Sequence, residues 1–350
     1  MSAAPRLHLQ IRGVALAVPA GGLELSELAA EFGDKEIARI IKATGISRVR
    51  IAPPELCASD LCAHAAERLL AELDFDRAQI GGLIFASHSP DHPMPATACL
   101  LQQRLGLPQR LAAFDLPYGC SGFAYGLIQA AMLLETGLAE HVLVLAGDTM
   151  VRKVNPADRA LRMVLGDGGG AALVSRGPHE TVVAFGTDGG GAASLMIPAG
   201  GFRLPASAAT AQVVTGEDGS GRSRNDLYMD GTAILRFALD RVPPLVDELL
   251  AGMGWDRDGL DYAFLHQANG FIIDYLRKKL KLPQAKVPIH LGRYGNLSPA
   301  SLPLVLCAEL AGRPVMPERV VLAGFGVGLS WAGLATSLAG CRCLPILELP

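Results

Sequence analysis

Residues 112–132, AAFDLPYGCSGFAYGLIQAAM, decide how the rest of the chain is arranged. The segment opens with a short apolar run around Phe114 that is typical of a strand. It turns at Pro117–Tyr118–Gly119 and continues from Cys120 with the spacing of apolar residues expected of a helix. A cysteine held between a strand and a helix by glycines has the form of a nucleophile elbow. The sequence therefore predicts an α/β fold built around a strand–Cys120–helix unit.

Cys120 is the first candidate catalytic residue. It falls at the first turn of the predicted helix, where free N–H groups and the positive end of the helix dipole favour a thiolate. Burial as one more small core residue is the commoner fate of a free cysteine. The local sequence alone leaves both interpretations open.

Length and composition limit the classes of protein to consider. The 350 residues are too many for one ordinary core, so we expect two halves, 1–180 with the nucleophile and 181–350. A net charge of −3 provides no field that would attract nucleic acid or a membrane surface. Seven cysteines without framework spacing, and a start without a signal pattern, predict a cytoplasmic protein with reduced thiols. The large apolar fraction favours an oligomer.

Strands and helices alternate in both halves, which predicts layered α/β architecture. Strands are expected at 6–18, 82–86, 111–114, 141–146, 181–185, 262–265 and 320–323, and a further one follows the glycine turn at 167–170. Helices are expected at 23–46, 59–73 with Ser59 as N-cap, 97–105, 232–252, 270–280 and 301–310. The polar stretch 205–226 is expected to be a loop. Residues 320–338 are long enough to cross a bilayer, but their four glycines favour strand, turn and strand instead.

Three further segments carry residue types that support chemistry. His266 in HQAN stands between a predicted strand and a helix, Asn296 follows a glycine in YGNLSPASLPL, and the turn at 324–328 is GFGVG. Each has an ordinary structural explanation when it is considered alone. The histidine would be a satisfied structural residue and the asparagine a turn former.

Together the motifs resemble one family. CSGF, GDGGGAALV, LYMDG, HQAN, YGNLSPASLPL and GFGVGLSW follow one another in the order found in the ketoacyl-acyl-carrier-protein synthase III family, over about residues 8–338. The resemblance implies the thiolase-like fold, in which two similar α/β halves form αβαβα layers. It also implies a homodimer in the cytoplasm that works with acyl carrier protein.

The resemblance also implies roles for individual residues. Cys120 would take an acyl group from a thioester, and the amides of Cys120 and Val327 would form the oxyanion hole. His266 and Asn296 would donate hydrogen bonds to the thioester carbonyl of a malonyl extender, where negative charge builds up as CO2 leaves. The reaction needs acyl-CoA or acyl-carrier-protein thioesters as substrates and no bound cofactor, and no metal-ligand spacing is evident.

The chain departs from the family at the positions that bind the donor. Family members that use acetyl-CoA carry a tryptophan and an arginine just before Thr-Gly-Ile, whereas residues 38–43 contain no tryptophan. This departure favours a starter acyl group bound to carrier protein over one bound to CoA. Gly270–Phe271 replaces the arginine that helps to dock the carrier protein, and a nearby basic run is the alternative docking face: Arg277, Lys278, Lys279 and Lys281. Met94, from the partner of a dimer, and Phe325 are the candidates for the acyl pocket.

Other functions fit the residues less well. An acyltransferase on the same scaffold would pass the acyl group from Cys120 to an alcohol or amine, but it does not need His266 and Asn296. A biosynthetic thiolase would need a second cysteine in the final glycine turn. The cysteine signature of papain-like proteases is absent. A silent partner subunit would not need all three residues.

Overall fold

The computed structural model describes residues 5–350 and is built on a ten-stranded mixed sheet. Seven strands follow one another across it in the order β12 (Tyr262–Leu265), β13 (Val320–Gly326), β14 (Ser330–Thr336), β7 (Gly168–Thr187), β6 (His141–Asp148), β4 (Ile80–Ala86) and β5 (Ala112–Leu116). β1 (Arg6–Pro19) lies beside β7, and β15 (Arg342–Cys343) and β16 (Leu347–Leu349) add to β1. The two edge strands of the series, β5 and β12, each run parallel to their neighbour.

The long strand β7 joins the two parts of the sheet. Its residues 168–175 pair with β6, and its residues 182–187 pair with β14. β1 runs antiparallel along both stretches and shifts register between His8 and Gln10, opposite residues 176–179. The division predicted at 180/181 falls inside this strand, and the description as two domains stays a prediction.

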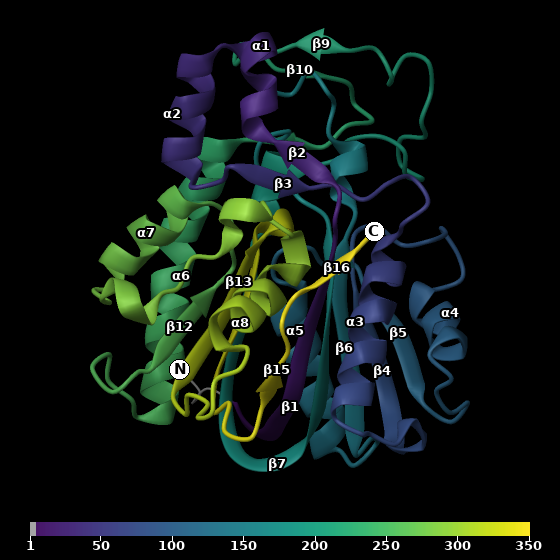
Figure 1. The fold of residues 1–350 in the computed structure, drawn as a ribbon, viewed down its shortest axis with the longest axis vertical. Coiled ribbons are helices and arrows are strands. Elements are labelled where there is room, and N and C mark those ends of the chain that lie inside the picture. The colour runs from purple at the N-terminus through teal and green to yellow at the C-terminus, as the bar shows by residue number, and fades with distance from the viewer. Residues whose placement is uncertain (1–4) are drawn as a thin grey trace.

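Helices form three layers around the two parts of the sheet (Figure 1). α3 (Ala58–Glu72) and α4 (Thr97–Arg104) cover one outer face, and α6 (Gly231–Met253) and α7 (Gly270–Lys279) cover the other. Between them lie α5 (Gly122–Glu135), which contacts β4 and β6 as well as β13 and β14, and α8 (Ser301–Leu310), which contacts β1 and β12. The layers therefore alternate as αβαβα, as the family resemblance implies.

The hydrophobic pattern explains this arrangement. α5 and α8 are apolar around most of their circumference, which suits helices covered on both sides. Three buried clusters fill the spaces between the layers: a central one around α5 and α8, one beneath α6 and α7, and one beneath α3 and α4. No helix within residues 5–350 is long and apolar enough to cross a membrane.

Short elements gather at one end of the molecule, at the top of Figure 1. They include β2 (Gly22–Glu24), α1 (Ala29–Phe32), α2 (Asp34–Thr44), β3 (Arg48–Arg50), β9 (Val214–Thr215) and β10 (Gly221–Arg222). A second two-stranded sheet joins β8 (Leu195–Met196) to β11 (Tyr228–Met229). Single 3₁₀ turns connect other elements, at Leu25–Leu28, Arg77–Gln79, Met150–Lys153, Gly189–Ser194, Gln284–Lys286, Leu291–Arg293, Ser298–Ala300 and Val327–Leu329.

Three expectations about local structure were wrong. The single helix at 23–46 is divided, because Gly33 has φ +85° between α1 and α2. Ser59 is not the N-cap of α3, because Cys57 occupies that position and the Ser59 hydroxyl donates to Asp91 instead. The break expected at 176–178 is a register shift against β1, so one strand continues where two were predicted. Most other predicted elements agree with the structure to within a few residues.

Candidate active site

Cys120 lies between the end of β5 and the start of α5. The N–H of Gly122 donates to the Gly119 carbonyl at 2.6 Å, which makes the turn tight. No side chain caps the N-terminus of α5, because the Ser121 hydroxyl is paired with Ser330 at 2.7 Å. The first N–H groups of the helix are therefore left without a side-chain acceptor next to the cysteine, as expected for an elbow.

The glycine turn after β13 closes over the cysteine. A Cβ added to Gly326 would lie 2.6 Å from the Cβ and 2.8 Å from the Sγ of Cys120, so only glycine leaves room here. The N–H groups of the next residue, Val327, and of Cys120 itself both lower the pKa of the Cys120 thiol. These are the two amides predicted for the oxyanion hole. The Ser330 hydroxyl donates to the Val327 carbonyl at 2.9 Å and fixes the turn.

The thiol of Cys120 is protonated at rest. Burial raises its pKa to about 11, and the carboxylate of Asp148 acts in the same direction. The neighbouring Ser298 hydroxyl and the N–H groups of Val327 and Cys120 lower this pKa without outweighing burial. Backbone N–H groups thus favour the thiolate, but desolvation outweighs them, and the contribution of the helix end stays a prediction.

His266 follows β12 directly and is 2% exposed. Its N–H donates to the Ala323 carbonyl at 2.8 Å, which ties it to β13, and its ring packs edge-on against Phe325 with centroids 5.4 Å apart. Burial lowers the pKa of His266 to about 3, so the imidazole is neutral at physiological pH. Its Nδ1 is buried and has no hydrogen-bond partner among residues 5–350.

Asn296 is held by backbone contacts on both sides. Its N–H donates to the Val164 carbonyl at 2.8 Å, and its carbonyl accepts from Gly166 at 3.0 Å. Its side-chain Oδ1 accepts from the Ser298 N–H at 2.9 Å. With Oδ1 in this contact, the Nδ2 of Asn296 donates to no residue within 5–350.

The three predicted residues are joined by shared neighbours. Ser298 donates its N–H to Asn296 and packs beside Gly119, the residue before Cys120. The stretch Phe325–Gly326 links His266 to Cys120. The elements that carry them come from both halves of the chain. The candidate site thus forms where the end of β5 meets the ends of β12 and β13.

The remaining predicted residues lie in different surroundings. Phe325 is buried against the His266 ring, whereas Met94 is 81% exposed. The basic docking candidates lie at the end of α7 and just after it, where Arg277 and Lys278 both pair with Asp274. Lys279 and Lys281 are exposed.

The sequence analysis missed two residues at the site, Asp148 and Ser298. Asp148 is fully buried at the end of β6 and accepts a hydrogen bond from the Ser298 hydroxyl at 2.7 Å. An acidic residue directly after the buried run HVLVLAG was the available signal, because a charge in that position needs a partner. For Ser298 the sequence held no such signal, because serine is common in turns that follow a glycine.

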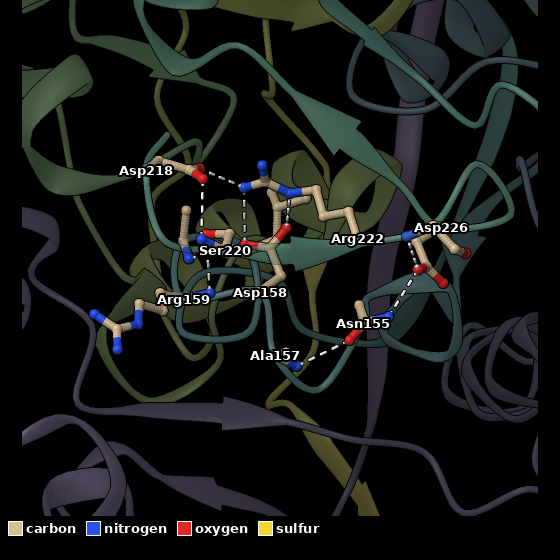
Figure 2. Close-up of polar contacts among 11 residues, drawn as sticks. Asn155, Ala157, Asp158, Arg159, Asp218, Ser220, Arg222 and Asp226 are labelled. Atoms are coloured by element: carbon tan, nitrogen blue, oxygen red, sulfur yellow. Dashed lines mark hydrogen bonds and ion pairs between the residues drawn. The ribbon is translucent and has the colours of Figure 1, made fainter. Parts of the chain in front are cut away.

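The polar stretch 205–226 is mostly irregular, as predicted, but it contains the short pair of strands β9 and β10, and it is anchored at one end. Figure 2 shows Arg222 paired with the buried Asp158 and with Asp218 at 2.8 Å. Asn155 donates to Asp226 at 2.8 Å in the same cluster. The neighbouring Arg159 extends away from these contacts, and its guanidinium stacks over Phe32.

The layered fold and the cysteine at a strand-to-helix turn define the class: a thiolase-like enzyme that transfers acyl groups. The model of the 3-oxoacyl-[acyl-carrier-protein] synthase III family matches residues 114–189, and the model of its C-terminal region matches residues 250–338. The chain is 36% identical over 297 residues to a beta-ketoacyl-[acyl-carrier-protein] synthase III of Caldanaerobacter subterraneus, covering 84% of this chain and 87% of that protein.

Solved structures agree with this relationship. A 3-oxoacyl-(acyl-carrier protein) synthase from Burkholderia xenovorans superposes with a TM-score of 0.92 at 36% identity and full coverage of both chains. The priming beta-ketosynthase of the R1128 polyketide pathway has a TM-score of 0.80 at 30% identity and covers 97% of this chain and 98% of its own. The chain belongs to the 3-oxoacyl-[acyl-carrier-protein] synthase III family.

Proposed function

We propose that the protein catalyses a decarboxylative Claisen condensation. An acyl group passes from a thioester to Cys120, and malonyl-acyl carrier protein then condenses with it to give a 3-ketoacyl thioester for fatty acid or specialised lipid and polyketide biosynthesis. The observation that carries this proposal is the pair His266 and Asn296 beside Cys120, with a neutral imidazole and a free amide Nδ2. Two neutral donors are suited to an oxygen that becomes negative during the reaction.

In the first half-reaction the sulfur of Cys120 attacks the thioester carbonyl. The oxygen of that carbonyl becomes an oxyanion, and we assign its stabilisation to the N–H groups of Cys120 and Val327. Both groups are near enough to lower the pKa of the thiol, so an acyl group on the sulfur would bring its oxygen towards them. The acyl enzyme results when the original thiol leaves.

In the second half-reaction malonyl thioester loses CO2 and becomes an enolate. We assign His266 and Asn296 to the enolate oxygen, because a neutral donor does not have to give up its proton for the charge to be stabilised. The enolate carbon then attacks the acyl carbonyl on Cys120, and binding at one site replaces an encounter in solution. Simple transfer of the acyl group to an alcohol or amine needs no such pair, which favours condensation.

We further propose that the enzyme is a homodimer. β5 is an edge strand whose outer side pairs with no other strand within residues 5–350, and native proteins normally cover such an edge. Met94 is exposed shortly before α4, and α4 packs on β5 through N–H groups that donate to Asp115. A second copy at this edge would cover Met94 and bring it to the partner's acyl pocket, beside Phe325. Sedimentation velocity should then give twice the chain mass.

Acyl carrier protein is the proposed partner, and α7 is the proposed docking surface. Phe271 and Tyr275 are about half exposed there, with ring centroids 5.5 Å apart, next to Lys278 and Lys279. An acidic carrier protein complements this combination of aromatic and basic side chains. Acyl-CoA is the alternative starter donor. The seven cysteines are all free thiols, which is consistent with a cytoplasmic enzyme.

Intact-protein mass spectrometry tests the reaction. The enzyme is offered a panel of acyl-CoAs and acyl-carrier proteins, and malonyl-carrier protein is added second, with Cys120→Ala as control. We expect an acyl adduct on Cys120 that malonyl thioester discharges as a 3-ketoacyl product. An adduct that only an alcohol or amine discharges would instead make the protein a plain acyltransferase.

A further inference from the structure

Arg50 is a buried cation close to the candidate site that the proposed reaction does not use. It is the last residue of β3, and its side chain is 3% exposed. Its guanidinium donates to five oxygen atoms: the carbonyls of Pro19 and Ala20 at 3.1 Å, the carbonyl of Arg293 at 3.3 Å, and the two carboxylate oxygens of Glu348 at 3.1 and 2.5 Å. Glu348 is the one acid that pairs with it among residues 5–350. A buried charge needs acceptors of this kind to remain ionised.

β16 brings the carboxylate to Arg50. Glu348 lies opposite Val18 where β16 runs parallel to β1, and the Leu349 carbonyl accepts from the N–H of Ala20 at 2.6 Å. The Glu348 side chain is half exposed, so solvent reaches the pair from one side. The hydrogen bond with Arg50 lowers the pKa of Glu348, so the carboxylate is ionised at neutral pH. Its two oxygens hold the planar guanidinium in one orientation.

Arg50 contacts the segment that leads to Asn296. The N–H of Arg50 donates to the Tyr294 carbonyl at 3.1 Å, and its Nε donates to the carbonyl of the preceding residue, Arg293. The guanidinium also lies over the Tyr294 ring, 5.3 Å from the ring centroid. Arg50 therefore fixes two consecutive carbonyl groups directly before Gly295 and Asn296.

Arg50 also contacts the segment on the other side of Asn296. Its carbonyl accepts from the N–H of Asp167 at 2.9 Å. The residue before Asp167 is Gly166, which donates to the Asn296 carbonyl, and a Cβ added to Gly166 would lie 2.1 Å from the Tyr294 carbonyl oxygen. The two segments that flank Asn296 are thus packed against each other with no room for a side chain between them, and Arg50 is hydrogen-bonded to both.

The other two candidate residues are supported differently. Within residues 5–350, the hydrogen bonds that hold them do not include Arg50. His266 is tied through its N–H to β13, and Cys120 lies at the tight turn between β5 and α5. A disturbance of Arg50 should therefore displace Asn296 before it displaces the nucleophile or the histidine.

We propose that Glu348 and Arg50 are positioning residues that aim the side-chain amide of Asn296 at the enolate oxygen. This inference rests on the proposed role of Asn296 in condensation. Glu348 sets the orientation of the guanidinium, and Arg50 holds both segments that carry the Asn296 backbone. The Oδ1 of Asn296 is already bound by the Ser298 N–H, so the direction of its Nδ2 follows from the backbone. Glu348 and Arg50 do not touch the substrate, and both act through Asn296.

Nuclear magnetic resonance gives a readout that does not depend on the reaction. The chain contains four asparagines, so labelling with 15N-asparagine yields four side-chain amides: Asn155, Asn225, Asn269 and Asn296. Asn296→Ala identifies the signal of Asn296. In Glu348→Gln, which keeps the length of the side chain and loses the charge, this signal should shift or broaden while the other three stay in place. An Asn296 signal identical to that of the unmodified enzyme would overturn the proposal.

The two reaction steps provide a second readout. In Glu348→Gln we expect the kcat of condensation to fall by about tenfold, and in Arg50→Lys by about 10²-fold, because a small misplacement of a donor is costly. Arg50→Lys keeps the charge but lacks the planar fork that contacts both carboxylate oxygens. The rate of Cys120 acylation and the KM for the malonyl thioester should stay close to those of the unmodified enzyme. Equal losses in both steps would overturn the proposal, since the pair would then only support the fold.

A double-mutant cycle separates positioning from general support. If Glu348 acts through Asn296, Glu348→Gln should have no further effect on condensation in an Asn296→Ala background. The same tenfold loss in that background would contradict the proposal. Glu67→Gln is the matched control, because it removes a carboxylate that accepts from another arginine, Arg77, at 3.0 Å outside the site. It should leave both steps and the Asn296 signal unchanged.

Failure of the proposed function has a different signature. If the unmodified enzyme is acylated on Cys120 but malonyl-carrier protein yields no 3-ketoacyl product, the proposed function is refuted. The resonance of Asn296 in Glu348→Gln then still decides whether Glu348 positions this side chain.

Discussion

Two strand-to-helix junctions carry the candidate site, and they differ at the helix end. β5 leads through Cys120 into α5, and β12 leads through His266 into α7; both strands lie at the edges of the series and run parallel to their neighbours. At the first junction no side chain caps the helix. At the second, Asn269 caps it, with Oδ1 accepting from the Ile272 N–H at 2.8 Å.

The difference between the two helix ends matches the charge that each residue carries during the reaction. The uncapped end leaves N–H groups beside the sulfur, where an anion has to form. The capped end has its donors occupied, and His266 stays a neutral residue in an apolar environment next to Phe325. Equivalent backbone units therefore serve one residue that must carry negative charge and one that must remain uncharged.

The largest effect should separate the two junctions by reaction step. Cys120→Ala should abolish acylation, because no nucleophile remains. His266→Ala and Asn296→Ala should lower condensation by about 10²- to 10³-fold while acylation changes much less, because each removes one donor to the enolate oxygen. Rapid-quench mass spectrometry of both steps measures this. Equal losses in the two steps would refute the division of roles.

A second test crowds the first junction alone. Gly326→Ala would place a methyl group 2.6 Å from the Cβ of Cys120, so the cysteine must shift. We expect acylation to fall by about 10²-fold because of misplacement. Gly231→Ala, at the start of α6 with open space around it, should leave acylation unchanged. Wild-type acylation rates in Gly326→Ala would mean that the turn does not restrain Cys120.

A third test concerns the protonation state at the second junction. His266 should show no titration between about pH 5 and 8 in NMR spectra, because burial lowers its pKa to about 3 from an ordinary 6.5. Below about pH 6 the unfolded chain then binds more protons than the native protein, so the free energy of unfolding falls as pH falls.

His266→Ala should make that fall shallower, by at most about 1.36 kcal/mol per pH unit. Urea unfolding at several pH values measures the slope. An unchanged slope, or a His266 resonance that titrates near pH 6.5, would contradict a neutral buried imidazole.

The smallest effect concerns the cap itself. Asn269→Ala should lower the free energy of unfolding by about 1 kcal/mol, because it removes the acceptor at the start of α7. Asn269→Asp keeps an acceptor oxygen and should restore most of the stability. Denaturant titration of both variants decides the point, and equal destabilisation by alanine and aspartate would show that capping is not the role of Asn269.

Much of the fold followed from local patterns. The spacing of apolar residues predicted β12 and α8 to the residue and the other core elements to within a few, because each of these segments buries one or both faces. Predicted boundaries were wrong where a backbone conformation or a distant contact decided them. Gly33 divides the first helical region, and β1 keeps β7 continuous through Arg176–Gly177–Pro178.

The sequence by itself determined the alternation of strands and helices, the family resemblance with the αβαβα layers that it implies, and Cys120, His266 and Asn296 as candidates, because residue type and order along the chain carry that information. Only the tertiary structure decided the electrostatics of the site. The protonated thiol of Cys120, the neutral ring of His266 and the hydrogen bond from Ser298 to Asp148 all depend on burial and on groups far apart in the chain. Desolvation is a property of the folded environment, and no local pattern encodes it.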